Sequence, residues 1–190
     1  MMFFLPFPMS LCWIIWSKTE MKTYTYFVEG ECEQKLLNAL KATPSLIHPG
    51  KVRVFNVIKN CLKTSSLISI KDGYVVFVFD SDVPETGALK QNIEAVKRIN
   101  PAKTSKLLFL VQVKNLEDEL VRATDIDSVE ELTRSKSRKN FKADCLTLKD
   151  CRSKLERHCF DIKKMWRKGI PEPFSFITQG AEMLYVPSFL

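Results

Sequence analysis

Histidine is scarce in this chain, with two residues in 190, and none of the six cysteines forms a Cys-x-x-Cys pair. The nearest approach to a zinc pattern is Cys145, Cys151, His158 and Cys159, whose spacing matches no standard zinc motif. A zinc site is therefore disfavoured, and the cysteines are interpreted as reduced thiols of a cytoplasmic protein. Internal repeats and low-complexity tracts are also missing from the sequence.

The first sixteen residues, Met1–Trp16, lack any charge and are strongly apolar. This run is too short for an ordinary membrane span, and Pro6 and Pro8 interrupt it, so no stable membrane insertion is expected. A secretory signal is disfavoured because no Lys or Arg precedes the run and no small-residue cleavage site follows it. We interpret residues 1–20 as the product of a start codon upstream of a natural start at Met21. A membrane-tethering tail and a partner-docking patch are the open alternatives.

The net charge of +7 is distributed unevenly along the chain. Between Arg134 and Lys168 there are thirteen Lys or Arg against four Asp or Glu, a balance of +9, so the rest of the chain carries −2. A basic segment beside a mildly acidic body suits a protein that holds an anionic polymer and a metal ion. A solvated helical face explains the same segment without any ligand.

Hydrophobic patterning predicts strands that alternate with helices as far as residue 124. The expected strands are Thr23–Val28, Lys51–Ile58, Tyr74–Phe79 and Lys106–Val113, and the expected helices are Glu31–Lys41, one through Leu89, Ile93 and Val96, and one through Leu116, Leu120 and Ala123. Residues 60–70 are ambiguous between a helix and a loop. The continuous apolar run in Tyr74–Phe79 is typical of a central strand that is buried on both faces.

This alternation predicts an α/β fold with a mostly parallel, Rossmann-like sheet of four strands and flanking helices. Residues 21–124 form the expected catalytic domain. Residues 125–190 form a basic, mostly helical C-terminal extension that ends in an irregular tail from Gly169. An apolar stripe through Cys151, Leu155 and Cys159 further predicts buried thiols in that extension.

Acidic residues stand at the ends of two predicted strands. Glu29 and Gly30 follow the first strand, and Asp80-Ser81-Asp82 ends the third. In a parallel sheet the carboxyl ends of the strands share one edge, so Glu29 is expected near Asp80 and Asp82. Converging carboxylates repel one another unless a cation intervenes, and hard oxygen ligands select Mg²⁺ or Mn²⁺. Asp in a turn or at a helix cap is the simpler explanation for each motif taken alone.

Glu33 falls on the apolar face of the predicted first helix, because it lies three, four and seven residues before Leu36, Leu37 and Leu40. A glutamate whose only role is to interact with water is expected on the exposed face of the helix instead. Glu33 is therefore interpreted as a second ligand or as a residue that orients the acidic cluster. Gly30 would let the backbone turn tightly after Glu29.

The segments YFVEGECE and VVFVFDSD together resemble the TOPRIM domain of topoisomerases, primases and OLD-family nucleases. The resemblance covers residues 22–113, and the Glu-Gly-x-x-Glu form that ends in Glu33 is most similar to the OLD and RloB-like branch of bacterial defence systems. It implies acid–base chemistry or metal binding at Glu29 and metal binding at Asp80 and Asp82. In OLD-like nucleases a further acid serves a second metal, and Glu117 or Asp118 is the candidate here. An acidic helix start, which the helix dipole favours, explains both residues equally well.

The basic run from Arg134 to Lys142 is the best candidate for phosphate contact, through Lys136, Arg138, Lys139 and Lys142. A lysine in this run could also neutralise the scissile phosphate in the transition state. A basic helix whose side chains are simply solvated explains the same run equally well.

The chain is too short for the further domains of a topoisomerase or a primase. A Mg²⁺- or Mn²⁺-dependent nuclease is therefore expected, acting on DNA or RNA as a toxic effector of antiphage defence. Another protein of the same system is its expected partner, and it could form a homodimer. The alternatives are a non-catalytic module that binds nucleic acid or a partner, and a small RNA-maturation ribonuclease of the TOPRIM class. The segment after Asp82, Val83–Gly87, is a poor match to the Asp-x-Asp-x-x-Gly turn of those ribonucleases.

Overall fold

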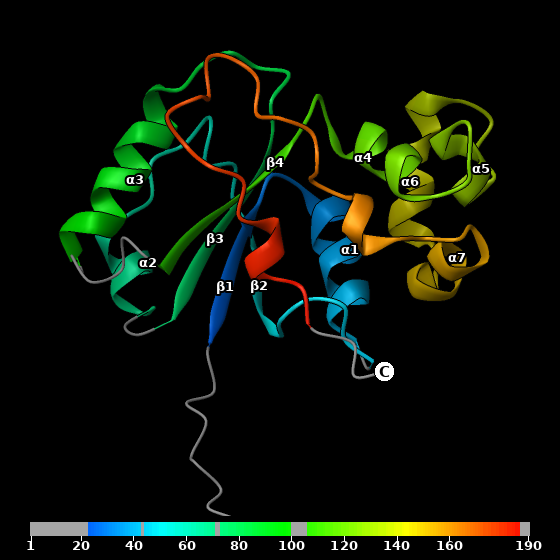
Figure 1. Cartoon of the computed structure of the whole chain (residues 1–190), viewed down its shortest axis with the longest axis horizontal. Helices are drawn as coiled ribbons and strands as arrows, with labels where there is room; N and C mark the ends of the chain where they lie inside the picture. The colour runs from blue at the N-terminus through cyan, green and yellow to red at the C-terminus, as the bar shows by residue number, and fades with distance from the viewer. Residues whose placement is uncertain (1–22, 43, 71–72, 100–105, 187–190) are drawn as a thin grey trace, which may run out of the picture.

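The computed structural model describes residues 23–42, 44–70, 73–99 and 106–186 and shows an α/β fold (Figure 1). Its strands are β1 (Tyr24–Val28), β2 (Gly50–Val54), β3 (Tyr74–Asp80) and β4 (Leu107–Gln112). They form one sheet in the order β2-β1-β3-β4, and every neighbouring pair is parallel. The expected α/β fold with a parallel, Rossmann-like sheet of four strands is confirmed.

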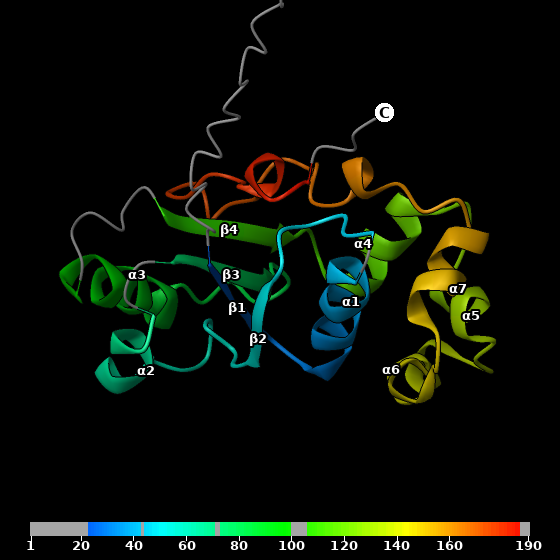
Figure 2. The same cartoon turned by 90° about the horizontal axis from the view of Figure 1, so that it is seen from below.

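Helices cover both faces of the sheet, as Figures 1 and 2 show. They are α1 (Glu31–Lys41), α2 (Thr64–Ile68), α3 (Gly87–Ile99), α4 (Leu116–Ala123), α5 (Val129–Thr133), α6 (Arg138–Thr147) and α7 (Cys151–Arg157), with 3-10 turns η2 (Ile162–Lys164) and η3 (Ala181–Met183). Helix α1 packs on one face with α4 to α7 beyond it, and α2 and α3 pack on the other. Among the described residues, no helix is both long enough and apolar enough to cross a membrane.

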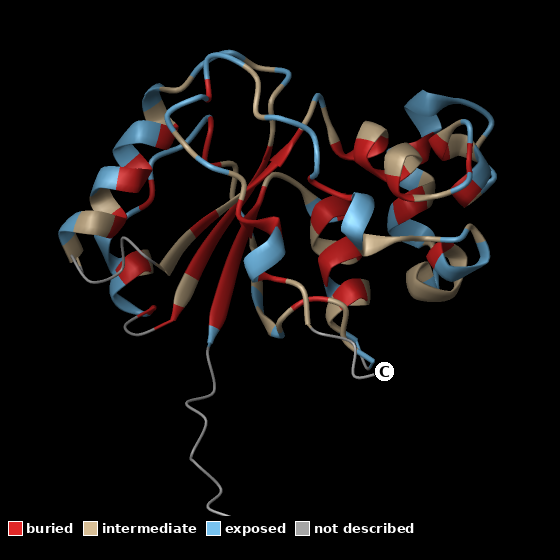
Figure 3. Ribbon diagram, in the orientation of Figure 1, coloured by how far each residue is buried: buried red, intermediate tan, exposed pale blue. Residues whose placement is uncertain are grey.

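The two central strands are apolar because both of their faces are buried (Figure 3). Alternate side chains of a strand point to opposite faces. On β1, Tyr26 and Val28 join the core under α1, whereas Phe27 joins the core under α3. On β3, Val76 and Phe77 divide between the two cores in the same way.

Strand β2 ends four residues earlier than the sequence pattern predicts. The chain turns at Asn56, whose side-chain Oδ1 accepts hydrogen bonds from the backbone N–H groups of Ile58 (2.9 Å) and Lys59 (3.0 Å). Val57 and Ile58 are apolar because they pack in the core under α3, and not because they continue the strand. The ambiguous residues 60–70 form a loop followed by the short helix α2.

The C-terminal extension shares its core with the sheet domain. Phe141, Leu155 and Trp166 are buried in the same cluster as Tyr26 and Leu37. The described parts of residues 21–124 and 125–190 are therefore packed against each other through apolar contacts. The interpretation of residues 1–20 lies outside the described residues.

The expected stripe of buried thiols is wrong at its far end. Helix α7 ends at Arg157, and Cys159 is exposed with a positive φ of 50°. The helical spacing fails there because the chain leaves the helix at His158, where the backbone carbonyl accepts a hydrogen bond from the N–H of Asp125 (3.1 Å).

The irregular tail covers the outer edge of β4. The side chain of Gln179 accepts from the N–H of Val111 and donates to its carbonyl, both at 3.0 Å. Gly180 donates its N–H to the carbonyl of Phe109 at 2.8 Å. These bonds satisfy backbone groups that an edge strand would otherwise expose.

Candidate functional site

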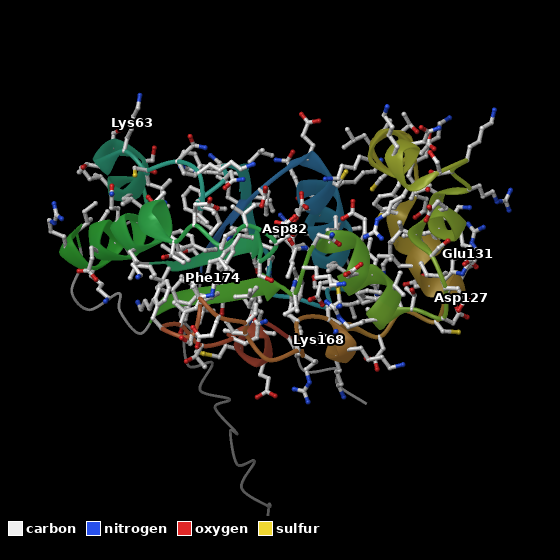
Figure 4. All side chains as sticks on the ribbon, turned by 90° about the horizontal axis from the view of Figure 1, so that it is seen from above. Lys63, Asp82, Asp127, Glu131, Lys168 and Phe174 are labelled. Carbon is white, nitrogen blue, oxygen red and sulfur yellow. The ribbon has the colours of Figure 1, made fainter. Side chains whose placement is uncertain are left out.

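The candidate site lies where the strand order reverses. The chain leaves β1 towards β2 on one side and leaves β3 towards β4 on the other, so the connections diverge between these two neighbours. Ligands of open α/β sheets bind at such switch points, beyond the carboxyl ends of the strands. Glu29 follows β1 and Asp80 ends β3 at this place. Figure 4 is seen from the side towards which the strands run and shows Asp82 near the centre of the molecule.

Glu29 and Asp80 are in direct contact although 51 residues separate them. The backbone N–H of Asp80 donates to Oε2 of Glu29 at 3.4 Å. The Oδ1 atom of Asp80 is buried and accepts no hydrogen bond from the described residues. Asp80 is paired in register with Gln112 on β4, whose own Oε1 is also buried and has no hydrogen-bond partner in the described part of the chain. Two oxygen acceptors at the end of adjacent strands are thus left unsatisfied.

The charge on Asp80 is disfavoured by its surroundings. Burial, followed by repulsion from Glu29, Glu33, Asp82 and Glu117, raises the pKa of Asp80 to about 8. Desolvation and like charges both stabilise the neutral form of a carboxyl group. The residues in these positions therefore form one electrostatic cluster of acids.

Glu33 belongs to this cluster through helix α1. Gly30 is the residue before the helix, and a Cβ placed on it would lie 3.0 Å from Oε2 of Glu33. Glu33 is buried, with 7% of its surface exposed, and burial is the main cause that raises its pKa, with Glu29 and Glu117 adding to the effect. The glycine therefore makes room for the Glu33 carboxyl beside Glu29.

Asp82 is the exposed member of the acidic cluster. It lies in a turn that is attached to the end of β4, since Ser81 donates its N–H to the carbonyl of Gln112 at 3.0 Å. The hydroxyl of Ser81 in turn accepts the N–H of Lys114 at 3.2 Å. These bonds fix the backbone before Asp82, while its side chain stays accessible to a ligand from solvent.

Glu117 and Asp118 start helix α4 and are both paired with cations from helix α6. Asn115 caps the helix by accepting the N–H of Asp118 at 3.0 Å. Asp118 accepts from Arg138 at 3.1 Å, and Glu117 lies 3.9 Å from Nζ of Lys142. Glu117 also raises the pKa of Asp80, so it lies on the inner side of this helix start.

The four predicted phosphate-binding residues separate into two groups. Arg138 and Lys142 are four residues apart on α6 and both reach the acids of α4. Partial burial alone would lower the pKa of Lys142, but Glu117, Glu33 and Asp80 together raise it above its ordinary value. Lys136 instead lines a separate surface hollow with Thr133, and Lys139 is exposed. Only the first pair lies at the acidic cluster.

The donor atoms suit a hard divalent cation. In residues 23–42, 44–70, 73–99 and 106–186, no three His, Cys, Asp or Glu side chains stand in a ready-made metal-binding group. The unpartnered Oδ1 of Asp80 nevertheless fits such an ion, because a cation would supply the partner and the positive charge that this oxygen lacks. The exposed carboxylate of Asp82 and the half-buried carboxylate of Glu29 are the nearby oxygen donors.

Glu119 is a further residue of this region that the sequence interpretation missed. It is fully buried, accepts the N–H of Val113 at 2.9 Å and that of Trp166 at 2.8 Å, and forms an ion pair with Arg122. Glu119 thereby ties the end of β4 to the C-terminal extension. The available signal was its position three residues after Leu116 and four before Ala123, on the inward face of the helix.

No match was found for this chain among protein-family models, curated proteins or solved structures. The fold is α/β with a parallel four-stranded sheet, and this arrangement is consistent with a Rossmann-like fold.

Proposed function

We propose that the chain is a TOPRIM-type, Mg²⁺-dependent nuclease that cleaves phosphodiester bonds of DNA or RNA. The observation that carries the proposal is Asp80 at the switch point, with a buried unpartnered Oδ1 and Glu29 in contact with its backbone. A buried carboxyl group whose pKa is strongly raised by neighbouring acids is a mark of functional sites. The resemblance extends the proposal to an effector of bacterial antiphage defence that works with another protein of its system.

Asp80 and Asp82 would hold Mg²⁺, or Mn²⁺ in its place, with Glu29 either as a third ligand or as the proton acceptor of the reaction. When bound, Mg²⁺ would polarise the scissile phosphate and lower the pKa of a bound water. Glu117 is the candidate for a second ion only if it exchanges its partner Lys142 for a metal. Asp118 is the weaker candidate, because Arg138 already binds its carboxylate directly.

The chain itself supplies a proton acceptor and a phosphate contact. Glu29 is half-buried, so its carboxylate can take a proton from an attacking water that approaches along the sheet edge. The side chain of Lys142 is 70% exposed and can turn from Glu117 to a phosphate oxygen. Arg138, four residues earlier on the same helix, can bind the next phosphate.

The test is metal-dependent cleavage by the purified full chain. Labelled single- and double-stranded DNA, RNA and tRNA are incubated with Mg²⁺, Mn²⁺ or EDTA. We expect cleavage in either metal and none in EDTA. Asp80→Asn and Glu29→Gln should each lower the rate by at least ~100-fold, because each removes a group that acts on the reacting atoms. Asp127→Asn is the matched control, since Asp127 is an exposed acid at the far helical end of the molecule (Figure 4).

The alternatives are separated by the same assay. Metal-dependent cleavage of structured RNA alone would favour the RNA-maturation ribonuclease. Binding of nucleic acid without cleavage in any metal would favour the non-catalytic module. Cleavage that survives in both Asp80→Asn and Glu29→Gln would refute the assigned site.

A further inference from the structure

A second basic stretch of the chain includes a segment on the face of the sheet opposite to α6. Residues 34–71 contain seven Lys or Arg and no Asp or Glu. Part of this stretch is the β2–α2 loop, residues 55–63, which carries Lys59 and Lys63. The basic segment from Arg134 to Lys168 is therefore not the only part of the chain with an excess of positive charge.

The β2–α2 loop begins beside the acidic cluster. Phe55 donates its N–H to the carbonyl of Val28, the residue before Glu29, at 2.7 Å. The loop then packs against α3, with Val57 and Leu62 buried in the core on that side. Helix α6 instead packs on the α1 side, so the loop and α6 flank the same sheet edge from opposite faces. Figure 4 shows Lys63 and the pair Asp127 and Glu131 on opposite sides of Asp82.

The loop is held in one shape by a buried side chain. Asn92 of α3 accepts the N–H of Leu62 at 2.6 Å and donates to the carbonyls of Val57 (2.9 Å) and Asn60 (2.8 Å). Asn92 is 1% exposed, so these bonds are shielded from water. A loop fixed in this way presents its outer side chains without a large ordering cost on binding.

The outer side chains of the loop are unpaired cations. Lys59 and Lys63 are exposed, and neither forms an ion pair with another residue that the structure describes. Arg138 and Lys142 differ, because they already contact Asp118 and Glu117. Lysines that are not already held by a neighbouring acid are available to bind a phosphate backbone.

We propose that Lys59 and Lys63 of the β2–α2 loop form a second nucleic-acid contact. The substrate then crosses the carboxyl edge of the sheet from this loop, over Asp80 and Asp82, to Arg138 and Lys142. The inference rests on the proposed function, since it names the path of the polynucleotide through that site. It adds a phosphate-binding surface that the basic C-terminal segment does not contain.

Salt-dependent binding tests this path. Labelled oligonucleotides are titrated with the full chain in EDTA, so that cleavage does not interfere, over a range of salt concentrations. The slope of log K against log salt concentration is negative, and the loss of two phosphate contacts reduces its magnitude by roughly 1.4 to 1.8. The double variant that carries both Lys59→Gln and Lys63→Gln should therefore have an affinity for the oligonucleotide that is roughly 25- to 60-fold lower at about 0.1 M salt. The melting temperature should not change, because both side chains are exposed.

The double variant of Lys51→Gln and Lys97→Gln is the control for the loss of two positive charges, and it differs in that Lys97 is paired with Glu94 at 3.0 Å. Lys51 lies at the start of β2 and Lys97 in the last turn of α3, both exposed or half-buried and away from the carboxyl edge. Equal binding by the two double variants, with weaker binding by Arg138→Gln and Lys142→Gln, overturns this inference and leaves the proposed function intact. Failure of the wild type to bind any DNA or RNA in EDTA overturns this inference, whereas the proposed function is decided separately by metal-dependent cleavage.

Discussion

Asp80 is the residue of this site whose negative charge is most disfavoured by its surroundings. Its main-chain N–H is bound to Glu29, while its own Oδ1 atom has no partner among the described residues. Four acids, Glu29, Glu33, Asp82 and Glu117, oppose its ionisation in addition to burial. In the absence of a cation, Asp80 is therefore most stable in the neutral form.

Asp80→Asn should make the metal-free protein more stable in alkaline solution. A carboxyl group whose folded-state pKa is raised to about 8 binds its proton more tightly in the folded state. Its contribution to stability is present at acid pH and is lost as the pH rises towards 8. We expect the variant to exceed the wild type by roughly 1–3 kcal/mol in free energy of unfolding at about pH 8, with a difference near zero at about pH 4.

Urea denaturation in EDTA at several pH values measures this difference. Asp127→Asn, which removes an exposed acid, should follow the wild type at every pH. Millimolar Mg²⁺ should stabilise the wild type and not Asp80→Asn, because a ligand that binds only the folded state adds to its stability. A difference in stability between the wild type and Asp80→Asn that stays constant from pH 4 to 8 in EDTA would contradict the raised pKa.

At the scale of single elements, the β2–α2 loop shows how a buried amide can replace regular secondary structure. The side chain of Asn92 satisfies one N–H and two carbonyl groups of residues 57–62. Asn56 adds a local turn at the start of the loop. The loop has few strand or helix hydrogen bonds of its own, so its shape depends mainly on Asn92, with a further bond from Sγ of Cys61 to Oε1 of Gln91 at 3.0 Å.

Asn92→Ala should loosen the β2–α2 loop. The substitution leaves the buried N–H of Leu62 and two carbonyls without partners, which costs about 1–3 kcal/mol in free energy of unfolding. Amide hydrogen exchange at Leu62 should become faster, while exchange in β3 should change only by the global loss of stability. Asn38→Ala is the control, because Asn38 is exposed on α1 and alanine favours a helix. Unchanged exchange at Leu62 in Asn92→Ala would show that the loop holds its shape without the amide.

The whole molecule is joined through one apolar cluster that runs from the sheet across α1 into the C-terminal extension. Leu37 and Leu40 of α1 share it with Phe141, Leu155 and Trp166. The buried carboxylate of Glu119 adds a polar link, because it binds the N–H groups of both Val113 and Trp166. Separating the extension from the sheet would expose apolar surface on both sides.

We expect the described body to unfold in a single transition for this reason. Calorimetry should give equal calorimetric and van't Hoff enthalpies. Residues 21–124 expressed alone should not show a cooperative transition, since the face of α1 that α6 and α7 cover would be open to water. Two resolved transitions of the full chain would indicate that the extension is an independent domain.

The sequence by itself determined the sheet and the location of the acids. The apolar run that ends in Asp80 and the alternation in Tyr24–Val28 are local patterns, and periods of two and 3.6 residues depend only on backbone geometry. Parallel strands then place Glu29 and Asp80 at one edge without further information. The end of β2 was not predictable in this way, because Val57 and Ile58 are apolar for packing in a loop.

Only the tertiary structure decided which charges meet. Arg138 and Lys142 reach the acids of α4, whereas Lys136, from the same basic run, does not. The roles of Glu119 and Asn92 also depend on partners 47 and about 30 residues away. The strength of a charge or a buried hydrogen bond depends on distance and solvent exposure in three dimensions, and neighbours along the chain do not fix either quantity.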